Sequence, residues 1–142
     1  MKLNTRNMKR ASGMTLLELT VVILVLLSLI SILFVGARAW KKGSDRAANI
    51  MVVRNVQQAV RSYQNMNNIA EGAALDMTAA GPIIGPGDFI ENTPTHPVAG
   101  LSYNYSATVP AIGTLVATST GTPTNGGTVA DYSPTAGTYN DW

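Results

Sequence analysis

Cysteine is absent from this chain of 142 residues, and His96 is its only histidine. The lack of cysteine excludes disulfides and thiolate metal sites, and a single histidine excludes a multi-histidine metal site. No Ser or acid stands at motif spacing from His96, so no set of nucleophile, base and orienting acid can be assembled around it. We interpret His96 as a loop histidine and do not expect an enzyme.

Basic residues are missing from the second part of the chain. All ten lysines and arginines lie at or before Arg61, whereas acids continue beyond Ser62. These later acids are Glu71, Asp76, Asp88, Glu91, Asp131 and Asp141. A nucleic-acid surface needs a basic patch, so the net charge of +2 does not indicate nucleic acid as a partner.

Charge is also scarce near the N-terminus, where Glu18 is the only charged residue between Met14 and Ala37. As a helix, the stretch from Leu19 to Ala37 spans about 28 Å, enough to cross a bilayer. The alternative, the apolar region of a secretory signal peptide, is shorter and ends at a small-residue cleavage site. The sequence therefore favours a membrane anchor. The basic flanks slightly favour a cytoplasmic N-terminus, with the C-terminal part outside the cytoplasm.

Helical periodicity continues beyond the apolar run. An aliphatic stripe recurs at helical spacing and predicts one buried face. It consists of Ile50, Val53, Val56, Val60 and Tyr63. We expect a single helix from about Thr15 to Met66, with the stripe covered by a C-terminal sheet. The basic band Arg38–Arg46, with Trp40, has two interpretations: contact with lipid headgroups, or pairing with the acidic part of a neighbouring subunit.

The C-terminal part alternates between breakers and strand patterns. Residues 69–100 form a Gly/Pro-rich connecting loop. Period-2 alternation predicts strands at Leu101–Val109, Ile112–Thr120 and Thr128–Ser133, with a short edge at Thr138–Trp142. The expected fold is therefore α+β. A long N-terminal α-helix, membrane-spanning in its first half and amphipathic in its second, packs on a small antiparallel β-sheet.

The hexapeptide Gly13-Met14-Thr15-Leu16-Leu17-Glu18 follows a short basic segment and opens the apolar run. It resembles the class III signal of type IV prepilins and of type II secretion pseudopilins. The resemblance implies that a prepilin peptidase cuts between Gly13 and Met14 and then methylates the new Met14 amine. The implied plan is a leader (1–13), a transmembrane and filament-core helix (14–37), an amphipathic helix half (38–68), a connecting loop (69–100) and a small sheet (101–142).

The resemblance also implies a function, that of a structural subunit in a pilus-like filament polymerised from the inner membrane. Its partners would be further copies of the chain or related pilins, the prepilin peptidase, the assembly platform and the bilayer. Glu18 would meet the Met14 amine of a neighbouring subunit, because a misregistered subunit would leave a buried charge unpaired.

Three versions of this function stay open: a type II secretion pseudopilin in a periplasmic filament, a type IV pilin in a surface pilus, and a permanently anchored ligand-binding module. The missing cysteines favour the pseudopilin, since type IV pilins often carry a disulfide. The segment Pro97–Tyr105 loosely resembles the start of the pseudopilin sheet and favours it too.

Two features depart from the family. Val35 stands where a proline is usual, so we expect a soft bend or none at Val35–Gly36. Pseudopilins bind calcium through late acidic residues, and here only Asp131 and Asp141 are candidates. Since Ca²⁺ takes six to eight oxygens, they are weak candidates, and we expect no other cofactor.

Overall fold

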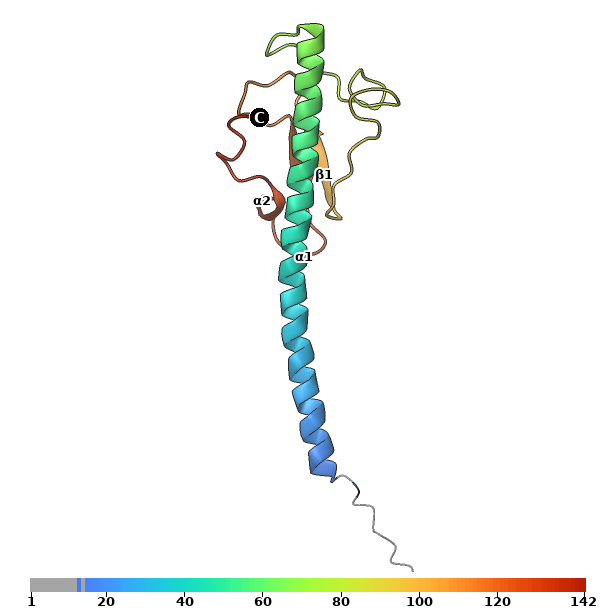
Figure 1. Cartoon of the computed structure of the whole chain (residues 1–142), viewed down its shortest axis with the longest axis vertical. Helices are drawn as coiled ribbons and strands as arrows, with labels where there is room; N and C mark the ends of the chain where they lie inside the picture. The colour runs from blue at the N-terminus through green and yellow to red at the C-terminus, as the bar shows by residue number, and fades with distance from the viewer. Residues whose placement is uncertain (1–12, 14) are drawn as a thin grey trace, which may run out of the picture. The chain divides into compact units, whose positions relative to one another are not determined.

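The computed structural model describes residue 13 and residues 15–142. Two helices and two strands follow in the order α1 (Leu16–Asn67), β1 (Leu101–Tyr105), β2 (Ala117–Gly121) and α2 (Val129–Tyr132) (Figure 1). A long N-terminal helix and a small antiparallel sheet confirm the α+β class. The chain divides into two compact units, residues 1–39 and 40–142.

The first unit contains the apolar part of α1. By length and composition α1 can cross a membrane, and its apolar window is wholly unburied. The hydroxyls of Ser28 and Ser31 donate to the carbonyls of Val25 and Leu27 at 2.7 and 2.8 Å, which satisfies both groups without solvent. The helix continues without interruption through Val35 and Gly36.

A local signal ends α1. Asn68 adopts a left-handed conformation with φ of 49°, which asparagine tolerates better than most residues. The N–H of Ile69 then donates to the carbonyl of Gln64 at 3.0 Å, a bond typical of a Schellman turn. The helix therefore stops where the apolar periodicity predicts.

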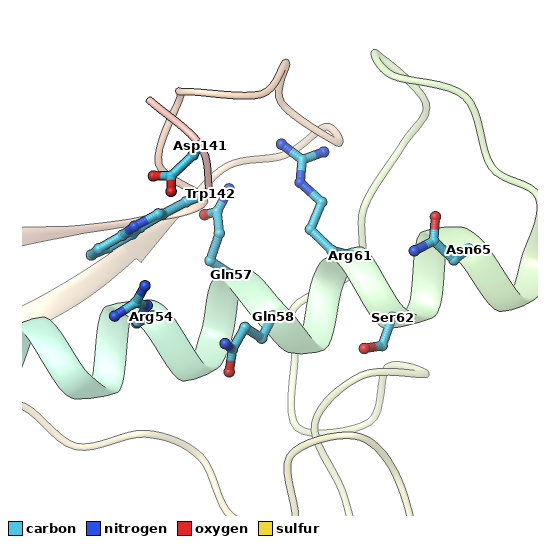
Figure 2. A pocket seen from close by; sticks show the side chains of 8 residues that line it. All are labelled: Arg54, Gln57, Gln58, Arg61, Ser62, Asn65, Asp141 and Trp142. Atoms are coloured by element: carbon cyan, nitrogen blue, oxygen red, sulfur yellow. The ribbon is translucent and has the colours of Figure 1, made fainter. Parts of the chain in front are cut away.

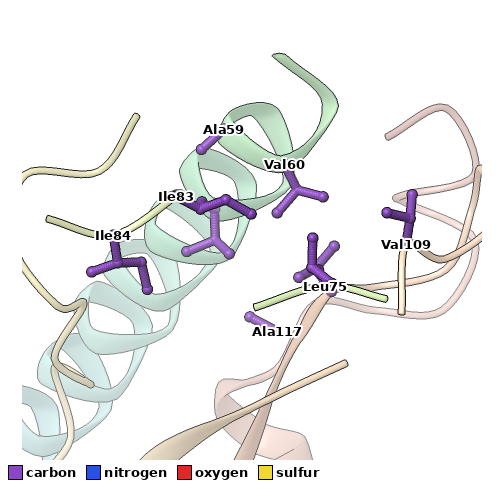
Figure 3. Close-up of a cluster of buried hydrophobic side chains, with 9 residues drawn as sticks. Ala59, Val60, Leu75, Ile83, Ile84, Val109 and Ala117 are labelled. Atoms are coloured by element: carbon purple, nitrogen blue, oxygen red, sulfur yellow. The ribbon is translucent and has the colours of Figure 1, made fainter. Parts of the chain in front are cut away.

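The main core of the second unit lies against the predicted stripe of α1. Val53, Val56 and Val60 are at most 1% exposed, which confirms the stripe. Figure 3 shows side chains from the connecting segment and from β2 converging on Ala59 and Val60. The cluster includes Leu75, Ile83, Ile84, Val109, Val116 and Ala117. The connecting segment 69–100, and not the sheet alone, therefore covers the helix.

The sheet has two antiparallel strands, with Leu101 opposite Gly121 and Tyr105 opposite Ala117. Its open end needs glycine, because a Cβ on Gly100 would lie 2.2 Å from the Thr122 carbonyl oxygen. The first strand ends earlier than predicted. The Ser106 hydroxyl bonds the backbone of Thr108, and residues 107–109 turn away to bond the backbone of residues 72–75.

The second strand also starts later than predicted, because a side chain of α1, and not a neighbouring strand, bonds the backbone just before β2. The buried Gln57 amide donates to the Thr114 carbonyl at 3.1 Å and accepts from the Val116 N–H at 2.9 Å. Arg61, one turn further, donates from Nη1 to the Pro110 carbonyl at 3.0 Å. Figure 2 shows both side chains projecting from the helix toward the C-terminal segment.

The prediction of a third strand at Thr128–Ser133 was wrong, as was the edge strand at Thr138–Trp142. Residues 129–132 form α2, whose first turn closes when the Asp131 carboxylate accepts from the Thr128 N–H at 2.8 Å. Turns form instead at the C-terminus, with Trp142 N–H donating to the Tyr139 carbonyl at 3.1 Å. Local side-chain bonds therefore override the alternating pattern.

Candidate processing and assembly site

The carboxylate of Glu18 closes the first turn of α1. Its Oε2 accepts from the Thr15 N–H at 2.9 Å and from the Thr15 hydroxyl at 3.1 Å. The Thr15 hydroxyl in turn accepts from the Glu18 N–H at 3.3 Å. This reciprocal arrangement is a capping box, which satisfies two N–H groups that a helix start leaves free. Glu18 thus has a structural partner inside its own chain.

The spacing Thr15-x-x-Glu18 is the sequence signature of a capping box, a signal that was missed at the level of the sequence. A cap of this kind contributes about 0.5–2 kcal/mol to helix stability. The bonds described use only Oε2, so Oε1 is directed to no group among the described residues. The same carboxylate can therefore cap the helix and still accept from a second group.

The two other predicted processing residues are placed only in part. Gly13 is exposed and belongs to no helix, and a Cβ added there would meet nothing within 4 Å, so the backbone at Gly13 itself is accessible. Met14, the predicted site of N-methylation, and residues 1–12 of the predicted leader lie outside the described residues. The geometry of the expected pair between Glu18 and a Met14 amine is therefore a prediction that stands on the sequence.

The apolar side chains that follow Glu18 have no cover in the first unit. From Leu16, at 82% exposed, to Val35, at 72%, large aliphatic side chains point outward on every side of the helix. Burial of each such side chain is worth about 1.5–3 kcal/mol. This exposed apolar surface fits a helix that can cross a membrane by length and composition.

Residues of the basic band contact the chain's own C-terminal part. Lys42 Nζ lies 3.1 Å from a carboxylate oxygen of Asp131, and Arg46 donates to the Thr135 hydroxyl. Lys41 bonds Asp45, the next acid along the helix, at 3.2 Å. Trp40 is 78% exposed. These contacts inside the chain are a third role, beside the two that the sequence left open.

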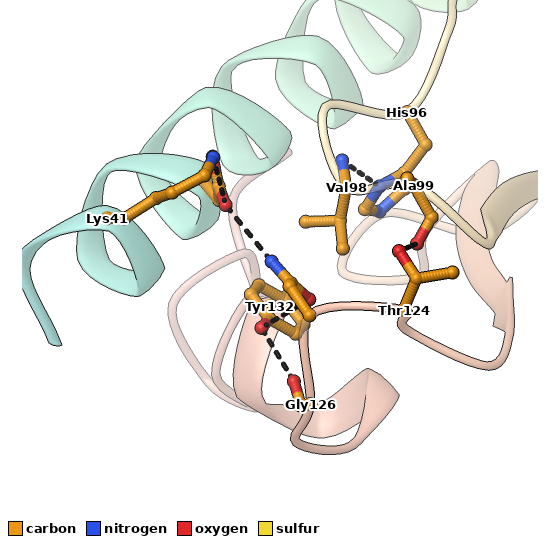
Figure 4. A network of polar contacts seen from close by, with 9 residues as sticks. Lys41, His96, Val98, Ala99, Thr124, Gly126 and Tyr132 are labelled. Carbon is orange, nitrogen blue, oxygen red and sulfur yellow. Dashed lines mark hydrogen bonds and ion pairs between the residues drawn. The ribbon is translucent and has the colours of Figure 1, made fainter. Parts of the chain in front are cut away.

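The buried end of this polar region connects α1 to α2. Asp45 accepts from the Asn125 amide at 3.4 Å, and Asn125 accepts from the Tyr132 hydroxyl at 3.0 Å. Figure 4 shows this chain of contacts running from Lys41 to Gly126. The Tyr132 ring is 1% exposed, so these bonds fix the loop around α2 on the helix.

His96 belongs to a second polar cluster that sequence spacing could not reveal. Its Nε2 lies 3.1 Å from the Ser119 hydroxyl, and its Nδ1 accepts from the Val98 N–H at 3.0 Å. Because Nδ1 is used as an acceptor, the neutral ring carries its proton on Nε2 and donates it to Ser119. A base for a serine nucleophile needs the opposite tautomer, so this geometry does not activate Ser119.

The two calcium candidates occupy different surroundings. Asp131 accepts from the Thr128 N–H, which lowers the pKa of its carboxyl, and Lys42 lowers that pKa further. Asp141 lines a pocket with Arg54 and Arg61. An ammonium thus takes the place beside Asp131 that a cation would use. Among residue 13 and residues 15–142, no three His, Asp or Glu side chains gather at one point to hold a metal.

Comparison with protein-family models, with curated proteins and with solved structures finds no match for this chain.

Proposed function

We propose that this protein is a structural subunit of a type IV pilus-like filament, processed by a prepilin peptidase and polymerised from the inner membrane. The observation that carries the proposal is a carboxylate at the third position of a helix whose following apolar side chains are exposed all round. For a simple anchor the cap returns only about 0.5–2 kcal/mol, less than the roughly 2.5–3.5 kcal/mol that an acid in a membrane helix costs on insertion scales. In a filament subunit, the same carboxylate can fix the position of the subunit relative to its neighbours.

The proposed mechanism has two steps. Cleavage after Gly13 releases an ammonium at Met14, and methylation keeps its positive charge. The apolar surface of α1 then exchanges lipid for the helices of neighbouring subunits. Within that assembly Glu18 pairs with the Met14 ammonium of a neighbour, because either charge left alone in an apolar core is costly.

The proposed location follows from this mechanism. Before assembly the chain is a single-pass protein of the inner membrane, with the N-terminus cytoplasmic and the C-terminal part extracytoplasmic. We favour a periplasmic type II secretion pseudopilus over a surface pilus, because the chain has no cysteine to form the disulfide that pilins often carry. A permanently anchored binding module is the second candidate, favoured by the pocket at Arg54 and Arg61.

Mass spectrometry of the membrane protein tests the processing step. We expect a chain that starts at N-methylated Met14 and lacks residues 1–13. If the protein isolated from membranes still began at Met1, this result would contradict the filament proposal and support the anchored module. Recovery of this chain as the main component of sheared surface filaments would instead indicate a surface pilus.

Two substitutions at one position separate the capping role of Glu18 from the charge-pairing role. Glu18→Gln keeps an oxygen that accepts from the Thr15 N–H, because glutamine also completes a capping box, but it removes the charge. We expect Glu18→Gln to lower filament yield by at least about tenfold, since an unpaired buried charge costs about 3–5 kcal/mol. Glu18→Ala removes both functions and should assemble no better. Wild-type assembly of Glu18→Gln would show that Glu18 serves only as a cap.

A further inference from the structure

A pocket of about 470 Å³ lies between α1 and the C-terminal segment of the second unit. Its wall includes two arginines of the helix, Arg54 and Arg61, together with Asp141 and Trp142 (Figure 2). The rest of the lining is polar and comes from Gln57, Gln58, Ser62 and Asn65. This volume lies within the range of small-molecule sites, about 300–1,000 Å³.

Arg61 lines this pocket, and one edge of its guanidinium has no hydrogen-bond partner among the described residues. Its Nη1 donates to Gln64 Oε1 at 2.9 Å and to the Pro110 carbonyl at 3.0 Å, which fixes the plane of the guanidinium. Its Nε and Nη2 are shielded from water and have no hydrogen-bond partner among the described residues. These two nitrogens form one side of the guanidinium, the fork that binds a carboxylate through two parallel hydrogen bonds.

A buried cationic fork without a partner is costly, because its nitrogens have lost water and gained nothing in return. Pro110 and Gln64, the two groups that Arg61 contacts, are neutral. Asp141 lines the same pocket, yet the ion pairs within residues 15–142 include neither Asp141 nor Arg61. This edge of Arg61 therefore has no acidic partner within residues 15–142.

The charge of the pocket selects among anions. Arg54 lies over the Trp142 ring, with its guanidinium carbon 5.1 Å from the ring centroid, so an aromatic face already neighbours this cation. Asp141 adds a negative charge to the wall, and Glu71 lies on the adjoining hollow that shares Arg61. Two acids beside the site oppose a dianionic phosphate more than a monoanion. The amide side chains suit a ligand that also carries hydrogen-bonding groups.

We propose that this pocket binds a small, polar monocarboxylate, whose carboxylate is held by Nε and Nη2 of Arg61. The ligand enters beside the Trp142 wall, which is joined to the adjacent turn by a long bond of 3.4 Å from the Gly113 N–H to the Trp142 carbonyl. The amides of Gln58 and Asn65 then hydrogen-bond its polar groups. This site does not depend on filament assembly, so it holds equally for a subunit and for an anchored protein.

Nuclear magnetic resonance of the full chain in detergent micelles tests this site. The probe is N-acetylglycinate, and its neutral match is N-acetylglycinamide, which has the same shape without the carboxylate. We expect N-acetylglycinate to shift the Arg61 Nε–H and Trp142 indole N–H signals saturably, and the amide to leave both unchanged. Equal shifts with the two compounds, or no saturable shift, would overturn the proposal.

Variants assign the effect to the fork. Arg61→Lys keeps the charge but has no fork, and it should bind N-acetylglycinate at least about tenfold more weakly. Arg46→Lys lies on the same helix away from the pocket and should bind like the wild type. Asp141→Asn removes a neighbouring negative charge and should bind more tightly. Thermal unfolding of each variant checks that it is folded, and wild-type binding by folded Arg61→Lys would refute the fork.

Two further measurements distinguish a small monocarboxylate from phosphate and from a carboxylate supplied by a second copy of the chain. Inorganic phosphate should bind more weakly than N-acetylglycinate, and tighter binding of phosphate would contradict the choice of a monocarboxylate. If the carboxylate instead came from a second copy of the chain, the Arg61 signal would change with protein concentration before any ligand was added. We expect no such change.

Discussion

Asn49 is a polar side chain in the apolar stripe of α1, and it is fully buried. Its Nδ2 donates to the Ser119 hydroxyl at 3.1 Å and to the Tyr132 carbonyl at 2.8 Å. Its Oδ1 accepts from the Tyr103 hydroxyl at 2.6 Å. One amide thus holds both strands and α2 on the helix. Without it the Tyr103 hydroxyl and the Tyr132 carbonyl would lose their partner, whereas Ser119 would keep its bond to His96.

Replacing Asn49 by alanine should therefore destabilise the second unit by about 2–4 kcal/mol, because buried polar groups that lose a partner cost about 1–3 kcal/mol each. Urea unfolding of the full chain in detergent, followed by near-ultraviolet circular dichroism of the tyrosines, measures the change. Asn55→Ala, on the exposed side of the same helix, should change stability by less than about 0.5 kcal/mol. Similar effects of the two substitutions would contradict this role of Asn49.

His96 makes the stability of this unit depend on pH. Burial lowers its pKa below the ordinary 6.5, although the Asp45 carboxylate acts in the opposite direction. A proton on Nδ1 would also face the Val98 N–H, which the neutral ring accepts. His96 therefore takes up a proton at a higher pH in the unfolded chain than in the folded chain. Its contribution to the free energy of unfolding is fully present above pH 6.5 and is lost as the pH falls below that value.

We expect the urea midpoint to fall as pH is lowered from above 6.5 toward the folded pKa of His96. His96→Gln keeps a group that accepts from the Val98 N–H but does not titrate, so its midpoint should change little over this window. If the midpoint of the wild type and that of His96→Gln changed equally with pH, other groups would be responsible.

The contacts of these residues differ in how far the sequence could predict them. Glu18 could be identified from the sequence as the single acid in an apolar run, and its capping-box spacing with Thr15 was also present in the sequence. The sequence alone could not bring Ser119 to His96 or Pro110 to Arg61, because these partners lie 23 and 49 residues away and depend on the packed core. Contacts within one turn can be predicted from the sequence, whereas contacts across elements require the fold.

The loop that leads into α2 depends on glycine. Gly126 and Gly127 have φ of 85° and 93°, a conformation that other residues adopt at a cost. A Cβ on Gly127 would lie 2.8 Å from the Asp131 carboxylate and 3.4 Å from Lys42 Nζ. The close approach of this loop to the Lys42–Asp131 pair therefore requires glycine.

Gly127→Ala should reduce stability by about 2–3 kcal/mol, which combines about 1–2 kcal/mol for the left-handed conformation with the displacement of Asp131. Gly137→Ala is the matched control, because Gly137 has φ of 89° but open space around it. It should lose only the conformational part. A smaller loss for Gly127→Ala than for Gly137→Ala in urea unfolding would refute the steric argument.

The elements also show why strand prediction failed where helix prediction succeeded. The stripe of α1 repeats over several turns, so each valine supports the same assignment. The predicted strand Thr128–Ser133 is only six residues long, and the bonds from Thr128 to Asp131 favour a turn of helix there. The secondary structure of a short alternating segment depends on such side-chain bonds and on the burial of a single residue, here Tyr132.

At the scale of the whole molecule, the two units differ in what covers them. Both core clusters lie within residues 40–142, whereas the apolar part of α1 has no protein cover. Arg38 and Lys41 stand near the boundary of the units, and Arg54 and Arg61 belong to the part of α1 that packs on the core. Proteolysis needs local unfolding, so the two pairs of sites should differ in susceptibility.

Limited trypsin digestion of the protein in detergent should therefore yield a resistant fragment that starts at Ala39 or Lys42. This fragment should stay soluble when detergent is removed, because the exposed aliphatic surface remains on the other piece. Mass spectrometry identifies the cut. A main product starting at Asn55 or Ser62 would show that the packed half of α1 opens before the boundary does.

The buried amides of α1 have a consequence for the order in which the chain folds. The partners of Asn49 lie 54, 70 and 83 residues later in the chain, so α1 leaves the ribosome well before the segments that cover it. During that interval Val53, Val56 and Val60 form an uncovered apolar stripe, and in the proposed membrane-anchored chain this stripe would lie close to the bilayer. Asn49 and Gln57 interrupt this stripe, and their amides are costly to transfer into lipid without partners. In the proposed membrane-anchored chain this cost would favour a position in water for the second half of α1 until the partners of both amides have been synthesised.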